Sequence, residues 1–118
     1  MKVEIDESIR RVPALVEPVQ QANAFLEELA GASSPHLRAA WRLSPRDDQQ
    51  IEFVLSEDNG YRVEVRPAFP VKNLLDPVNR KLRLFQVWDT VLQARSKQNM
   101  ARISESIGRL EAEETDGQ

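Results

Sequence analysis

The sequence contains no cysteine and only one histidine, His36. The absence of cysteine excludes disulfide bonds, thiolate metal sites and cysteine nucleophiles. With a single histidine, a catalytic zinc site would depend almost entirely on carboxylate ligands. A glycine-rich phosphate-binding loop is missing as well. His36 follows a proline ahead of the first predicted strand, where a surface loop residue is the usual interpretation. We therefore expect a protein that is not an enzyme and that uses no cofactor and no metal.

Long apolar runs are also missing. No run approaches the roughly 20 residues needed to cross a membrane, and the first residues lack the apolar core of a signal peptide. A net charge of -3 provides little general attraction to nucleic acid or to an anionic membrane. We expect a cytoplasmic protein with no membrane partner and no small-molecule ligand. The chain is predicted to form a single α+β domain over residues 1–110, followed by an acidic disordered tail over residues 111–118.

Three segments between Leu37 and Pro67 alternate apolar and polar residues. This alternation predicts strands with one buried and one solvated face. The apolar faces coincide if Trp41 lies opposite Phe53, because a slip of one residue would move every side chain to the other face. The sequence therefore predicts a three-stranded antiparallel meander, which Pro67 is expected to end.

The turn between the second and third strands contains Gly60. The buried face requires a three-residue loop, with Leu55 opposite Val63 and Phe53 opposite Val65. Such a loop needs a residue with positive φ at its end, and glycine adopts that conformation without strain. We therefore predict a positive φ at Gly60.

The polar face of the predicted meander is rich in arginine, with Arg42, Glu52 and Arg66 expected in one row. Two interpretations remain open. The simpler one is a solvated face with cross-strand ion pairs, and the other is a surface that docks an anion or an acidic partner. Because no aromatic residue lies on this face, stacking of single-stranded bases is not expected. The candidate docking residues are Arg38, Arg42, Arg62 and Arg66.

A long helix is predicted from Asp76, as N-cap, and Pro77 to about Leu110. Its apolar residues form two sets. The main stripe lies within about 120° of the helix circumference and comprises Val78, Leu82, Phe85, Trp88, Leu92, Ile103, Ile107 and Leu110. A second set widens the apolar surface in the middle and comprises Leu84, Val87, Val91 and Ala94. We expect the wide middle to pack on one face of the sheet. The last turns should extend beyond it, because a seven-residue strand covers only about 24 Å.

The last turns carry a seam with 3-4-3 spacing, formed by Met100, Ile103, Ile107 and Leu110. Either the N-terminal segment or a second chain could cover this seam. The N-terminal segment predicts a short helical piece from about Asp6 to Val12, a kink, and a firmer helix from about Pro18 to Ala30 that Gly31 closes. Because the prolines make this segment a poor continuous partner, we favour a second chain and hence a homodimer.

The order of a helix, a three-stranded meander and a long helix resembles that of YbaB-type nucleoid-associated proteins. The small, acidic, dimeric α+β character is similar to that of type III secretion chaperones. These resemblances concern order, length and character, not a specific motif. The first implies dimerisation and DNA contact through the basic helix face of Arg80, Arg83, Arg95, Arg102 and Arg109. The acidic tail counts against strong phosphate binding. The residues favour a protein-interaction or adaptor module that dimerises through its long helix, with DNA binding as the alternative.

Overall fold

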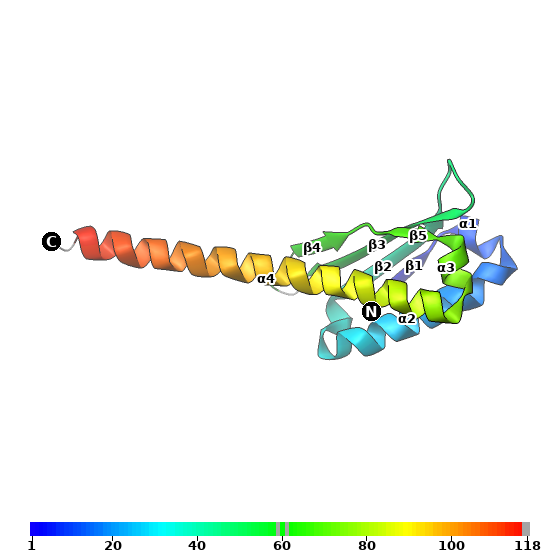
Figure 1. Cartoon of the computed structure of the whole chain (residues 1–118), viewed down its shortest axis with the longest axis horizontal. Coiled ribbons are helices and arrows are strands. Elements are labelled where there is room, and N and C mark those ends of the chain that lie inside the picture. The colour runs from blue at the N-terminus through cyan, green and yellow to red at the C-terminus, as the bar shows by residue number, and fades with distance from the viewer. Residues whose placement is uncertain (59, 61, 117–118) are drawn as a thin grey trace.

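The structure is a computed structural model that describes residues 1–58, 60 and 62–116, with side chains up to residue 108. The described residues form a five-stranded mixed sheet, and α2 and α4 lie on one of its faces (Figure 1). This confirms the α+β class and the long C-terminal helix packed against the sheet. The elements in order are β1 Lys2–Ile5, α1 Glu7–Arg10, α2 Pro13–Ala30, the 3-10 helix η1 Gly31–His36, β2 Leu37–Leu43, β3 Gln50–Asp58, β4 Arg62–Val65, β5 Ala68–Pro70, α3 Val71–Leu75 and α4 Pro77–Asp116.

The pairing of β2 with β3 confirms the predicted register, with Trp41 opposite Phe53. The two rings stack with their centroids 4.1 Å apart, and Phe69 of β5 packs edge-on against Trp41 at 5.5 Å. The indole Nε1 of Trp41 donates a hydrogen bond of 2.8 Å to Oδ1 of Asn23 in α2. This bond satisfies the one polar atom of a buried tryptophan, so the core joins the sheet to α2 without an unpaired donor.

The pairing of β3 with β4 differs from the prediction by two residues. Leu55 lies opposite Val65, and Val63 lies opposite Glu57. The residue opposite Glu52 is Ala68, so the predicted row with Arg66 is wrong. Apolar alternation distinguishes an odd slip from an even one, but two registers that differ by two residues bury the same face. Gly60 has a φ of 72°, as predicted, while Asn59 and Tyr61 lie outside the described residues.

Two strands were not predicted. β5 continues the pairing beyond Pro67 with the same offset as β4, because a proline removes only its own N–H from the ladder. The expectation that Pro67 ends the pairing is therefore wrong. β1 pairs in parallel with β2, with Val3 opposite Ala39. Val3 and Ile5 do alternate with charged residues, but a four-residue segment carries too little pattern to assign. The predicted meander is the middle of a larger sheet.

The N-terminal helices also differ in their boundaries. α2 begins at Pro13, and Pro18 lies inside it, so the helix does not start at Pro18 as predicted. A proline at this position removes the hydrogen bond to the carbonyl of Ala14, which is exposed and can bind water. Burial of Leu15 offsets that loss. Gly31 ends α2 with a φ of 55°, as predicted.

The cap of α4 is the predicted one. Oδ1 of Asp76 accepts hydrogen bonds from the N–H groups of Val78 at 3.0 Å and Asn79 at 3.3 Å. The helix continues to Asp116, past the predicted end at Leu110 and through residues expected to be disordered. Glutamate and alanine favour a helix there. The molecule measures 70 × 30 × 22 Å because the end of α4 projects beyond the sheet (Figure 1). In the part of the chain that is described, no helix has the length and apolarity to cross a membrane.

The positive φ at Gly60 leads to a first prediction. Replacing Gly60 with valine should lower the free energy of unfolding by more than about 1 kcal/mol, because a β-branched residue resists that conformation. An added Cβ would meet no atom within 4 Å, so the loss would come from backbone strain and not from a clash. Urea denaturation of the variant and of Gly60→Ala would measure it. A valine variant as stable as the wild type would rule out a strained turn.

Candidate interaction surfaces

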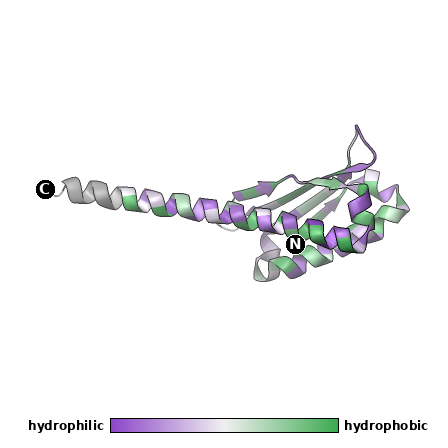
Figure 2. Ribbon diagram, viewed as in Figure 1, coloured by the Kyte–Doolittle hydropathy of each residue, from purple (hydrophilic) through white to green (hydrophobic). Residues whose placement is uncertain are grey.

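Exposed large apolar side chains recur along the described part of α4, and apolar residues alternate with polar ones along its ribbon in Figure 2. Seven large apolar side chains among those described on this helix are between 41% and 68% exposed. We call them the α4 stripe: Val78, Leu82, Phe85, Leu92, Met100, Ile103 and Ile107. Large apolar side chains that are exposed together on one side of a helix are typical of interaction sites.

The wide apolar middle of α4 was expected to pack on the sheet, and the structure confirms this, while Val78, Leu82 and Phe85 of the predicted main stripe stay exposed. The apolar side chains that α4 buries, among those described, are Leu84, Val87, Trp88 and Val91. Only Trp88 among them belongs to the predicted main stripe. A helix with apolar residues on two sides can bury either one, so its pattern alone does not determine which side faces the sheet. Two arginines of α4, Arg80 and Arg95, have partners inside the protein and add to the preference for the observed side.

Arg95 forms an ion pair with Glu57 of β3. Its Nε donates a hydrogen bond of 2.9 Å to Oε1 of Glu57, and a second guanidinium nitrogen binds Oε2. The guanidinium also lies 5.0 Å from the centre of the Trp88 ring and donates to Oγ of Ser33 at 3.2 Å. Glu57 is only 4% exposed. Glu57 continues the buried alternation of Phe53 and Leu55 along β3. A buried carboxylate of this kind requires a cation, and Arg95 supplies it.

The other described arginines of the proposed DNA-binding face also bind the protein itself. Arg80 is buried and donates to the carbonyl of Leu74 at 2.8 Å and to Oε1 of Gln21 at 2.6 Å. Arg83 Nε donates to the carbonyl of Ala68 at 2.8 Å. Arg102 binds the carbonyl of Gly60, and the side chain of Arg109 lies outside the described residues. Among the described side chains, these arginines position α4 instead of forming a free basic surface.

Side chains of α4 also form hydrogen bonds with backbone groups along the outer edge of the sheet. The amide of Gln98 accepts from the N–H of Arg62 at 3.2 Å and donates to its carbonyl at 2.9 Å. Farther along the same edge, Arg83 binds the carbonyl of Ala68 in β5. An edge strand with free backbone groups invites pairing with another chain. α4 satisfies some of these groups along β4 and β5.

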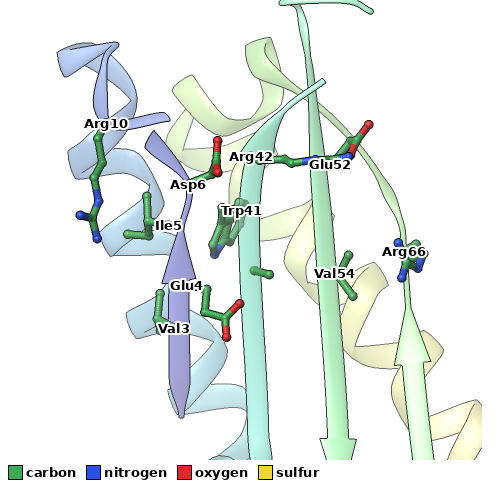
Figure 3. A pocket seen from close by; sticks show the side chains of 11 residues that line it. Val3, Glu4, Ile5, Asp6, Arg10, Trp41, Arg42, Glu52, Val54 and Arg66 are labelled. Carbon is green, nitrogen blue, oxygen red and sulfur yellow. The ribbon is translucent and has the colours of Figure 1, made fainter. Parts of the chain in front are cut away.

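The opposite face of the sheet carries the predicted arginine-rich surface and an open hollow of about 700 Å³ (Figure 3). Arg42 binds Glu52 at 2.5 Å and Arg38 binds Glu4 at 3.7 Å. Arg66 lies 3.5 Å from Glu64. Exposed pairs of this kind contribute about 0–1 kcal/mol each. This arrangement supports the simpler interpretation, a solvated face with ion pairs, for these three arginines.

Two further residues bear on the arginine-rich surface, Arg62 and the acidic residue Asp6. The N–H of Arg62 is bound to Gln98, at the far end of this face from the hollow. Asp6 lines the hollow and caps α1. Hydrogen bonding to Ser8 lowers the pKa of Asp6, and the nearby Arg42 acts in the same direction. The carboxylate of Asp6 therefore adds negative charge to the hollow, which weakens the case for an anion site there.

The structure places three members of the predicted seam, Met100, Ile103 and Ile107, on exposed positions. The side chain of Leu110 lies outside the described residues. α2 does not cover this seam. It lies beside the first half of α4, where the rings of Phe25 and Phe85 meet edge-to-face at 5.2 Å. The sequence therefore located half of the stripe and missed the half that includes Val78, Leu82, Phe85 and Leu92.

Comparisons with known proteins add no relative. No protein-family model matches the chain, and neither the curated proteins nor the solved structures include a significant match. Within the described ranges, no three histidine, aspartate or glutamate residues gather in a metal-binding group. His36 is exposed at the end of η1, as predicted.

Proposed function

We propose that this protein is a non-enzymatic interaction module that associates with a second copy of itself through the α4 stripe. The observation that carries the proposal is the exposure of seven large apolar side chains on one rigid helix. A monomer gains nothing from leaving them in water, whereas a helix-to-helix contact would remove them from it. The cytoplasmic location predicted from the sequence stays a prediction.

The projecting end of α4 provides the most direct test. Replacing both Ile103 and Ile107 with aspartate should convert a dimer into a monomer, because charges in an apolar contact must be desolvated. Sedimentation at tens of micromolar would measure the mass. The melting temperature of the wild type should rise with protein concentration, and that of the variant should not.

A matched control adds the same charge on another side of the same turns. Ala101 and Gly108 are exposed and lie off the stripe, and an added Cβ at Gly108 meets no atom within 4 Å. Replacing both with aspartate should leave the dimer intact. A wild type that sediments as a monomer at tens of micromolar would contradict self-association.

DNA binding by the basic side of α4 remains the alternative proposal. The engagement of Arg80, Arg83 and Arg102 with backbone carbonyls counts against it. Salt separates the two functions. Affinity for a DNA duplex would fall steeply between 50 and 200 mM salt as counterions are released, by roughly 1,000-fold or more for six phosphate contacts. An apolar protein contact would barely respond.

A further inference from the structure

We infer that the two copies pair their α4 helices in antiparallel orientation, with Phe85 of one copy opposite Ile103 of the other. This inference rests on the proposed self-association and specifies the occupant of the α4 stripe. It follows from the order of apolar and charged residues along the stripe, from the side on which the body of each protein lies, and from the charge at the ends of the helix.

The α4 stripe is apolar at both ends and polar in its centre. Val78, Leu82, Phe85 and Leu92 follow the 4-3-7 spacing of a heptad seam. The same seam contains Asp89 between Phe85 and Leu92, and it passes Ser96 and Asn99 before it reaches Ile103. Asp89 is exposed, and one of its carboxylate oxygens accepts a hydrogen bond of 2.9 Å from Gln93. Any pairing of two stripes must therefore accommodate a carboxylate near its middle.

A parallel pair would set every residue opposite its own counterpart. Asp89 would face Asp89 of the second copy within the seam, where like charges repel at close range. An antiparallel pair with its two-fold axis at the level of Ala94 removes that contact. In that register Asp89 lies opposite Asn99, which can donate hydrogen bonds to a carboxylate. The same register sets Phe85 opposite Ile103 and so matches the apolar ends.

The shape of the molecule favours the same orientation. The body of each chain lies along the first half of α4, and the second half projects away from it (Figure 1). Phe85 and Phe25 form an apolar shelf on the body, with the amine of Lys81 5.7 Å from the Phe25 ring. In an antiparallel pair, the projecting end of each helix lies on the shelf of the other copy. One contact then covers both halves of the stripe.

Charge at the ends of the helix agrees with this arrangement. The last eight residues of the chain contain four acidic and no basic side chains. A parallel pair would place the two acidic ends together. An antiparallel pair would place the two acidic ends at opposite ends of the helix pair. The electrostatic difference between the two orientations should decrease with added salt.

Two single-cysteine variants carrying nitroxide spin labels would test the inference, since the chain has no cysteine of its own. Gln93 and Ser104 are both exposed beside the stripe. A label at position 93 lies close to the two-fold axis, so its two copies should be separated by little more than the interaxial distance of about 8–10 Å plus the label arms. Labels at position 104 should be about 30 Å apart along the helix axis, at 1.5 Å per residue.

Each outcome of the distance measurement has one meaning. A short distance at position 93 together with about 30 Å at position 104 supports antiparallel pairing. Short distances at both positions show a parallel pair, which overturns this inference and leaves self-association standing. No dipolar coupling at either position at tens of micromolar overturns both. Sedimentation of the labelled proteins checks that the labels themselves do not break the dimer.

Discussion

Replacement of Arg95 with leucine is expected to lower the free energy of unfolding by about 3–5 kcal/mol. The loss arises because the carboxyl group of Glu57, which is 4% exposed, would stay in the core without its cation. The contact of the guanidinium with the Trp88 ring would be lost as well. Urea denaturation at one fixed protein concentration would measure the change.

Two further variants separate burial from charge. Replacing Arg42 with leucine breaks an exposed pair with Glu52 and should cost less than about 1 kcal/mol. Replacing both Glu57 and Arg95 with leucine should recover much of the loss, because neither charge is then buried alone. If Arg95→Leu were as mild as Arg42→Leu, the Glu57–Arg95 pair would not be a buried one.

Replacement of Phe53 with alanine is expected to lower the free energy of unfolding by about 3–5 kcal/mol. Phe53 is fully buried and stacks on Trp41, so its removal leaves a cavity between the sheet and α2. A loss of this size is a large part of the stability of a small domain. Thermal or urea denaturation would detect it directly.

The neighbouring residue provides the control. Val54 lies on the opposite face of the sheet and lines the open hollow there. Replacing Val54 with alanine should cost much less than the change at Phe53, since fewer contacts are lost. Equal losses at the two positions would mean that both faces of the sheet are covered in solution.

The elements that the sequence predicted well have local signals. The cap at Asp76 and the positive φ at Gly60 each depend on a few adjacent residues, and the pairing of Trp41 with Phe53 follows from the alternation of two neighbouring segments. The offset between β3 and β4 could not be predicted, because two registers bury the same face. β1 is too short for its alternation to be distinguished from chance.

The candidate site was predicted only in part, for a reason that lies in α4 itself. The exposed seam at Ile103 and Ile107 was expected from the reach of the helix beyond the sheet. The exposure of Leu82 was not expected, since α4 is apolar on two sides and contacts with the rest of the protein decide which side is buried. Arg95 and its bond to Glu57 are part of that choice. The alternation of β3 does indicate that Glu57 is buried. A buried carboxylate implies a cation nearby, and Arg95 of α4 is that cation.

The contacts at Gln98 and Arg102 attach the projecting helix to the sheet at one place. They are the last described hydrogen bonds between α4 and the sheet, and both attach to the hairpin that contains Gly60. Beyond Arg102 the helix backbone runs to Asp116, an arm of roughly 21 Å at 1.5 Å per residue. The helix beyond Arg102 is therefore an arm that is attached to the rest of the protein at one end. A force applied to its tip acts first on the hairpin between β3 and β4.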